Sequence, residues 1–374
     1  MSLQLNGTDG VTFNDGSEQW AAASPIGPKN LIINGNMQIA QRGTSSTGIT
    51  TSGYYTVDRF GTLQTGLGTW TQTQDTDVPT GEGFSSSFKL DCTTADATLD
   101  AGDRLFLRQG IEAQNLQHLK FNTSSAESIT LSFWVKSNKT GTYSLAFINE
   151  DSSRSYVTTY SISVADTWEK KTITISGDTS GAINNDNGVG LWIYWNFGAG
   201  STWGGGSVNN AWESTVNANL GAGTTVNLAD STSNYLNITG VQLEVGDTAT
   251  PFEVMPYDMQ LARCMRYCIN YLAGGTVADS ATFGAGVVYQ STRFLGYVQL
   301  PTRMRDVPSI SPISPTALYV AAGGVVKLVT NLEIVGSPIT LRIDADTSTA
   351  MTVGHGAFLQ YNNASEDIIL DAEL

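Results

Sequence analysis

Few side chains in this sequence of 374 residues could carry out nucleophilic or acid–base chemistry. The only histidines are His118 and His355, which fall in two different predicted β domains. A Ser-His-Asp or Cys-His site needs a histidine within hydrogen-bond reach of the nucleophile, so such a site would have to form across those domains. We therefore interpret both histidines as structural or exposed, and expect no nucleophilic catalysis.

Four carboxylates lie close together in the sequence: Asp91, Asp96, Asp100 and Asp103. A glycosidase needs two carboxyl groups roughly 5–9.5 Å apart. Acidic residues in a loop-rich stretch are more often part of a solvated surface, and this interpretation is favoured. The sequence therefore predicts a protein that is not an enzyme, with a glycan-cleaving spike as the lesser alternative.

The sequence contains no complete motif for a metal site or a phosphate-binding site. Residues 184–188 read Asn-Asn-Asp-Asn-Gly, but they have neither the register nor the closing glutamate of an EF-hand, and ordinary turns use the same residue types. Residues 198–207 lack the lysine of a phosphate-binding loop and are interpreted as a flexible loop. No cofactor is predicted, and a structural calcium ion has no clear motif.

One segment suggests a ligand, because residues 191–197, LWIYWNF, are apolar on both faces of a strand. Four of them would face the core: Leu191, Ile193, Trp195 and Phe197. Trp192, Tyr194 and Asn196 would then project outward, with Trp203 and Trp212 in the loop that follows. Aromatic rings stack on the C–H faces of sugars, so these five residues are candidate glycan ligands. The favoured alternative is that Trp192 and Tyr194 pack under that loop or against another subunit.

The elements that position these residues are strands. In LSFWVKS, Leu131, Phe133 and Val135 alternate with Ser132, Trp134 and Lys136, and similar runs recur between polar turns. The apolar members of the other runs are Tyr143, Leu145, Phe147, Ile173, Ile175, Val241, Leu243 and Val245. Residues 30–255 therefore predict an antiparallel jelly-roll β-sandwich. Strand patterns return over residues 276–374 and predict a smaller C-terminal β-sandwich domain, so the fold class is mainly β.

The spacing of apolar residues changes from that of a strand to that of a helix over residues 256–272. Leu261, Cys264, Met265, Cys268, Tyr271 and Leu272 fall on one face of a helix. We expect a connecting helix within 256–275 that packs on a neighbouring domain or on symmetry mates. Cys92, Cys264 and Cys268 are too few for a disulfide framework, and they are predicted to be free, buried thiols.

The chain is acidic but sparsely charged, with 19 basic and 34 acidic residues, a net charge of −15 and only 14% charged residues. That charge repels nucleic acid and anionic membranes, so neither is an expected partner. The start of the chain has no basic apolar leader, and no apolar run is long enough to span a membrane. We expect synthesis in a cytosol.

Residues 1–29 are turn-rich and hold too few apolar side chains to form a core alone. These side chains are candidate contacts for attachment and assembly, namely Leu3, Leu5, Val11, Phe13 and Trp20. Leu261, Met265 and Cys268 are further candidates from the predicted helix. Both segments carry more apolar surface than their neighbours in sequence can obviously cover, so a homotrimer is predicted.

Several blocks resemble a known family. NLIINGNMQIAQRGT at 30–44, YYTVDRF at 54–60 and ITGVQLEVGDTATPFE at 238–253, which runs into MPYDMQLARCMRYCINY, are similar to the jelly-roll domain of bacteriophage tail-fibre and related virion proteins. LPTRMRDVP at 300–308 and the final IILDAEL resemble the C-terminal domain of those proteins, and GVTFNDGSEQ resembles the short segments before such domains. The jelly roll also resembles carbohydrate-binding modules, but Met37-Gln38 stands where those modules often carry an acidic residue that helps to hold calcium.

The resemblance implies a trimeric virion appendage. Such a tail fibre would join other virion proteins through its N-terminal segment and meet a host-surface receptor, often a glycan. The alternative is a purely structural virion part, such as an adaptor or a capsid decoration. The expected location is the virion, after synthesis in the host cytoplasm.

Overall fold

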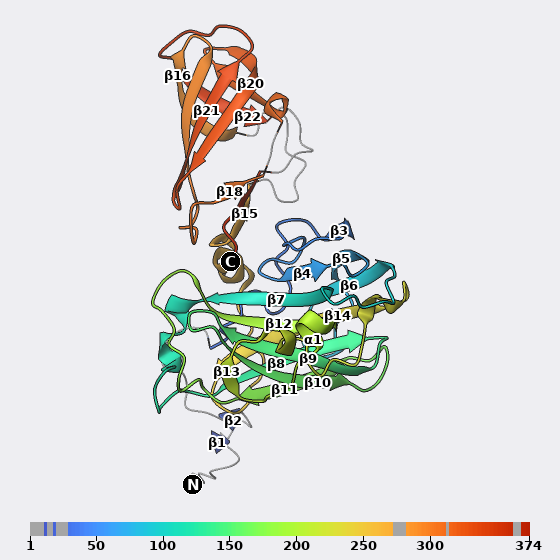
Figure 1. Ribbon diagram of the computed structural model, residues 1–374. Coiled ribbons are helices and arrows are strands. Elements are labelled where there is room, and N and C mark those ends of the chain that lie inside the picture. Colours follow the sequence, from blue (N-terminus) through green and yellow to red (C-terminus); the bar gives the residue numbers. More distant parts are fainter. Residues whose placement is uncertain (1–10, 13–17, 20–28, 272–281, 312–313, 362–367) are drawn as a thin grey trace.

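The computed structural model describes residues 11–12, 18–19, 29–271, 282–311, 314–361 and 368–374 (Figure 1). Leu3, Leu5, Phe13 and Trp20 lie outside the described residues. Val11 belongs to β1 (Val11–Thr12), which pairs antiparallel with β2 (Glu18–Gln19).

Two six-stranded antiparallel sheets form a β-sandwich, as predicted. The β12 sheet has the order β13 (Trp212–Ser214), β10 (Arg154–Ile162), β9 (Gly141–Asn149), β12 (Val189–Ala199), β7 (Arg104–Glu112) and β4 (Gly61–Thr65). The β8 sheet has the order β11 (Glu169–Ile175), β8 (Ile129–Ser137), β14 (Tyr235–Val245), β6 (Ser87–Thr94), β5 (Thr69–Asp75) and β3 (Ser45–Ile49). Short 3-10 turns occupy Ala113–Asn115, Gln117–Leu119, Asn217–Asn219 and Leu228–Asp230.

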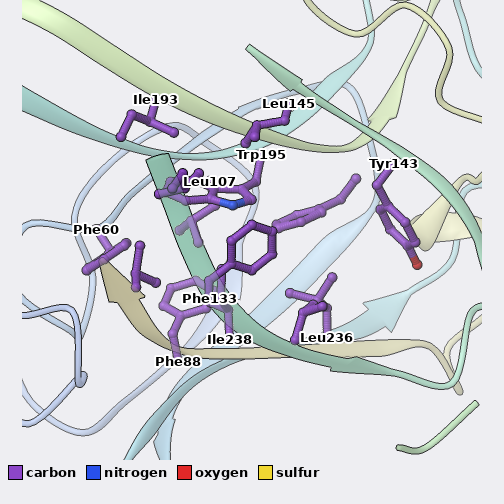
Figure 2. Packing of buried hydrophobic residues seen from close by; sticks show 14 of the residues in the cluster. Phe60, Phe88, Leu107, Phe133, Tyr143, Leu145, Ile193, Trp195, Leu236 and Ile238 are labelled. Carbon is purple, nitrogen blue, oxygen red and sulfur yellow. The ribbon is translucent and has the colours of Figure 1, made fainter. Parts of the chain in front are cut away.

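The inward-facing side chains, every second residue along each strand, fill the space between the two sheets. Phe133 of β8 and Trp195 of β12 are fully buried, and their rings meet edge to face at 6.0 Å (Figure 2). Leu131, Val135 and Leu145 are also fully buried in this core. These predicted inward residues are therefore confirmed, because alternate residues of a strand point to opposite sides of its sheet. Val245, at the end of β14, is an exception, since it is 39% exposed.

The C-terminal β domain closes into a barrel rather than a second sandwich. Its strand order is β16 (Thr282–Gln290), β17 (Arg293–Gln299), β21 (Thr340–Thr347), β20 (Val325–Gly336), β19 (Leu318–Ala322) and β22 (Gly356–Tyr361), with a 3-10 turn at Pro315–Ala317. Closure follows from pairing between β16 and β22. Alternation in sequence does not distinguish a barrel from a sandwich, because both bury one face of each strand.

A junction lies between the sandwich and the barrel (Figure 1). It contains α2 (Tyr257–Met265) and the three-stranded sheet of β15 (Cys268–Asn270), β23 (Ile369–Asp371) and β18 (Ser309–Ile310). The helix ends at Met265, so the prediction that Cys268 lies on it was wrong. Cys268 instead pairs with Asp371 of β23, a strand that sequence-local periodicity cannot anticipate. All three cysteines are free and buried, as predicted.

The apolar side chains of α2 are partly covered within the chain. Leu261 packs on a small cluster with Ile33, Ile39 and Tyr267, and Met265 packs on the barrel core. The helix therefore contacts the neighbouring domains of its own chain, which was one of the two predicted arrangements.

Buried charges hold the junction together. Arg59, fully buried, forms an ion pair with Glu373 and lies 3.4 Å from the ring centre of Tyr267. Arg42 contacts the same Glu373 at 3.4 Å, and burial raises the pKa of nearby Asp58 to about 6. The backbone of the C-terminal segment thus pairs with β15 and β18. The Glu373 carboxylate pairs with Arg42 and Arg59 of the sandwich domain.

A second ion pair, between a half-buried arginine and a buried carboxylate, anchors the end of α2. Arg266 donates to both carboxylate oxygens of Glu112 at 2.6 and 2.7 Å, and the Tyr267 hydroxyl donates to the same group at 2.6 Å. Burial alone would raise the pKa of Glu112, but these hydrogen bonds hold it below its usual value. The bidentate geometry fixes the orientation of the helix end against β7.

Candidate functional site

The aromatic segment of β12 is covered by its own chain. Trp192 is only 7% exposed, and Asn196 is fully buried. Residues 200–224 fold back over this face, with α1 (Ser201–Gly204) in the stretch for which the sequence predicted a flexible loop. Trp203 Nε1 donates to the Gly102 carbonyl at 3.2 Å, which ties that segment to the turn before β7. Trp192 is thus buried within its own chain and does not lie at an open surface.

Arginine side chains occupy the ring faces that a sugar would need. The Arg108 guanidinium lies 4.4 Å from the ring centre of Trp192, and Arg104 lies 4.1 Å from that of Trp203. Trp212 belongs to a separate group, where it meets Phe121 and Tyr156 edge to face. The structure therefore brings Trp192, Tyr194 and Trp203 together but leaves Trp212 apart.

The acidic stretch before β7 makes local contacts. Asp91 pairs with Lys89 at 3.1 Å, while Asp96 accepts from the Thr98 backbone at 3.2 Å. Asp103 is buried and accepts from the Asp100 amide at 2.8 Å. These groups cap turns and pair with a neighbouring lysine, so the cluster has a structural role.

Other sequence candidates have local roles as well. His118 lies in a 3-10 turn of the sandwich, whereas His355 lies in the barrel beside Gly323. In the 184–188 turn, Asn184 donates to Asp151 and the Gly188 amide donates to Asp186. Within the described ranges, no three His, Cys, Asp or Glu side chains group as metal ligands would.

A cavity of about 530 Å³ opens on the outer face of the β8 sheet. Trp134 of β8 forms part of its lining, together with Phe84 and Phe252, whose rings meet edge to face at 5.1 Å. All three aromatic residues are half-buried. We call this cavity the Trp134 pocket.

A bulge in β14 makes room for the Trp134 pocket. The pairing of β14 with β8 shifts between Thr239, opposite Trp134, and Gln242, opposite Ser132. Gly240 lies within this bulge with a φ of 61°, where a Cβ atom would come within 2.6 Å of Phe84 and 3.1 Å of Trp134. Only glycine adopts this backbone without strain and leaves the two rings in place.

Two distant segments are fastened together beside the bulge. The Val241 amide donates to the Gly35 carbonyl at 2.9 Å, and Asn30 Nδ2 donates to the Val241 carbonyl at 3.1 Å. Glu253 accepts from the amides of Lys29 and Asn30 at 3.2 and 2.9 Å. These contacts join the 30–44 and 238–253 blocks, which the family resemblance singled out, into the wall of one pocket.

Polar groups at the pocket complement its aromatic surface. Asn36 and Gln38 lie on one side, with Lys170 and Glu82 also in the lining. Asn36 is 6% exposed, and its Oδ1 atom has no hydrogen-bond partner among the described residues. A flat aromatic ring beside a few polar groups can stack on a sugar ring while amides and charges bind its hydroxyls.

Sequence reasoning placed Trp134 on the outer face but did not select it as a ligand. The available signal was a tryptophan at an outward position of an alternating strand, in the run LSFWVKS. Trp192 was selected instead because its strand is apolar on both faces, and the structure buries it. The partners Phe84 and Phe252 could not be assigned to Trp134, because only the folded chain brings them near it.

Comparisons with known proteins found no matching family model and no matching curated protein. Among solved structures, the enzymatically active domain of tailspike protein 4 of bacteriophage CBA120 is 16% identical, with a TM-score of 0.30; the match covers 58% of this chain and 21% of that one. A putative sugar-binding protein from Bacteroides thetaiotaomicron VPI-5482 is 12% identical over 58% of this chain and 99% of its own, with a TM-score of 0.32. A protein described under "CBM4 structure and function" is 11% identical over 57% and 97%, with a TM-score of 0.29.

The tailspike is a much longer chain, of which this protein matches about a fifth. These similarities are too low to carry an argument about function, which rests instead on the Trp134 pocket. Separately, none of the helices in the described part of the chain has the length and apolar character required to cross a membrane.

Proposed function

We propose that this chain is a bacteriophage tail-fibre protein that attaches to a host-surface glycan through the Trp134 pocket. The proposed glycan binding rests on the pocket itself, which Trp134, Phe84 and Phe252 line together with polar side chains. One of these, Asn36, has a buried acceptor without a partner among the described residues. The proposal that this is a phage protein rests on the resemblance of the blocks at 30–60 and 238–271 to tail-fibre and related virion proteins.

The proposed activity is binding without cleavage. Glycoside hydrolysis with an acid and a base or nucleophile needs two carboxyl groups on either side of the bond. Glu82 is the one carboxylate among the described residues that line the Trp134 pocket. A glycan held there would therefore meet a single carboxylate, and the release of reducing ends from a bound polysaccharide would contradict this proposal.

Replacing Trp134 with alanine is expected to weaken glycan binding by roughly tenfold to a hundredfold, because a stacking ring at the centre of a site contributes about 1.4–2.8 kcal/mol. The matched control is Trp203→Ala, which removes a half-buried tryptophan from α1, beside the other sheet of the sandwich. Titration of both variants with host polysaccharide measures the effect. An equal loss in the two variants, or no loss with Trp134→Ala, would rule out the pocket as the binding site.

Infection assays separate a fibre from a purely structural virion part. Phage carrying Trp134→Ala would assemble normally but adsorb poorly to the host if the chain is the attachment protein. Normal adsorption would favour the structural alternative. Removal of residues 1–24 is expected to prevent incorporation into the particle, since the proposed N-terminal segment attaches the chain to other virion proteins.

The proposed assembly is a homotrimer, and the barrel offers an apolar surface for it. Five residues lie side by side across β17, β16, β22, β19 and β20, in the order Tyr297, Ala285, Phe358, Ala321 and Val326. Tyr297, Phe358 and Val326 are 60%, 52% and 57% exposed. Because the row has no charged member, copies of a chain with net charge −15 could meet there with little like-charge repulsion.

A double substitution of Tyr297 and Phe358 by glutamate should convert a trimer to a monomer, because two carboxylates would be buried unpaired in each contact. Light scattering measures the mass of each form. Val353→Glu is the control, since Val353 is 57% exposed outside the row. A monomeric mass for the unmodified chain would refute the trimer, and an unchanged trimer in the double variant would place the interface elsewhere.

A further inference from the structure

Lys170 lies beside the stacking ring of the Trp134 pocket. It is directly opposite Trp134 in the pairing of β11 with β8, so the Cβ atoms of the two residues are about 4.5–5.5 Å apart. Lys170 is exposed and lines the pocket. Its ammonium group can therefore reach a ligand that stacks on the ring.

The charge of Lys170 is not neutralised within the described residues. Neighbouring lysines differ in this respect: Lys171 pairs with Glu169 at 2.5 Å, and Lys136 pairs with Asp77 at 2.7 Å. No carboxylate lies within ion-pair distance of Lys170 in the part of the chain that the structure describes. An unpaired cation beside an aromatic ring attracts an anionic group on a bound molecule.

Asn36 also lines the pocket, and its side chain has a hydrogen-bond acceptor that is left unsatisfied within the described residues. This acceptor, Oδ1, is buried, and an unsatisfied buried acceptor destabilises a protein. Because Asn36 lines the pocket, a rotation of its side chain would bring Oδ1 to a ligand hydroxyl or amide N–H, which would satisfy the acceptor. The pocket thus offers a ring for a C–H face, an acceptor for a donor group and a cation for an anion.

We propose that the Trp134 pocket binds an anionic sugar residue, whose carboxylate or sulfate group contacts Lys170 while a hydroxyl or amide group donates to Asn36. This inference rests on the proposed glycan-binding function and adds the charge class of the ligand. Glu82 is the opposing charge in the lining, where it is exposed. An anionic ligand therefore gains from Lys170 and is repelled by Glu82, so substitutions of the two residues should act in opposite directions.

The test uses the full chain on a panel of bacterial polysaccharides in which each acidic member is paired with its carboxyl-reduced or desulfated form. We expect binding that depends on Trp134 to be confined to acidic members, and removal of the acidic group to weaken binding by about tenfold or more. The carboxyl-reduced and desulfated arms identify which anion the pocket binds.

Charge-matched variants assign the effect to the pocket. Lys170→Gln should weaken binding of the acidic form about tenfold and leave the neutral form unchanged. Lys171→Gln removes the same charge from the next residue, which already pairs with Glu169, and should change binding little. Glu82→Gln should strengthen binding of the acidic form by roughly twofold, an effect that added salt reduces.

The outcomes distinguish this inference from the proposed function. Binding that depends on Trp134 but is equal for acidic and neutral forms would overturn the anionic ligand and leave glycan attachment intact. Equal losses in Lys170→Gln and Lys171→Gln would likewise overturn the role of Lys170. If no polysaccharide on the panel binds in a manner that depends on Trp134, both the proposed function and this inference fail.

Discussion

Replacing Arg59 with methionine is expected to lower the free energy of unfolding by about 3–5 kcal/mol, the usual cost of removing one partner from a buried ion pair. Arg59 is fully buried, forms an ion pair with Glu373 and donates to the Gly110 carbonyl at 2.6 Å. Methionine fills part of the space over Tyr267 but leaves a carboxylate that is 4% exposed, with Arg42 as its remaining cationic neighbour. Urea unfolding followed by tryptophan fluorescence measures the change.

The control for Arg59 is Lys120→Met. Lys120 pairs with Glu127, but the two side chains are 55% and 38% exposed, so this substitution should cost less than about 1 kcal/mol. Similar small losses in both variants would show that the junction ion pair contributes little. A large loss confined to Arg59→Met would support the C-terminal segment as the part of the chain that fixes the barrel to the sandwich.

Replacing Gly240 with alanine is expected to destabilise the protein by about 2–5 kcal/mol and to reduce glycan binding by at least about tenfold. Left-handed backbone costs an alanine roughly 1–2 kcal/mol, and overpacking costs roughly 1–3 kcal/mol. The new methyl group would come within 2.6 Å of Phe84 and 3.1 Å of Trp134, so the rings that form the pocket must move. Urea unfolding and polysaccharide titration measure the two effects.

Gly48→Ala separates backbone strain from crowding. Gly48 has a φ of 70°, close to that of Gly240, but a Cβ atom there would meet nothing within 4 Å. This control should lose only about 1–2 kcal/mol and retain full glycan binding. Equal losses of stability in the two variants, with binding unchanged in both, would contradict the role of Gly240 in shaping the pocket.

Strand patterning made the sandwich predictable. In LSFWVKS and LWIYWNF, every second side chain is large and apolar, and the structure buries those residues between the two sheets. The C-terminal domain was predicted as a β-sandwich, and the barrel could not be foreseen because closure depends on the pairing of β16 with β22. The helix was predicted too long, because Cys268 continues the helical spacing while its backbone pairs with Asp371, far along the chain.

The candidate site was less predictable than the fold. Sequence spacing placed both Trp134 and Trp192 on outward faces, and Trp192 was chosen as the candidate ligand because its strand is apolar on both faces. Trp192 is buried in a cluster with Ile148 and has Arg108 over its ring, whereas Trp134 lines a pocket together with Phe84 and Phe252. The difference lies in which remote segments fold over each face.

The sequence by itself determined that this chain is mainly β, acidic, poor in catalytic groups, and patterned so that certain faces of its strands are buried. These properties follow from composition and from the two-residue repeat of a strand, which are local. The tertiary structure decided which outward aromatic residue remains open, where the helix ends and which charges are buried together. Those outcomes depend on contacts such as Val241 with Gly35 and Arg59 with Glu373, and such long-range contacts leave no periodic signal in the sequence.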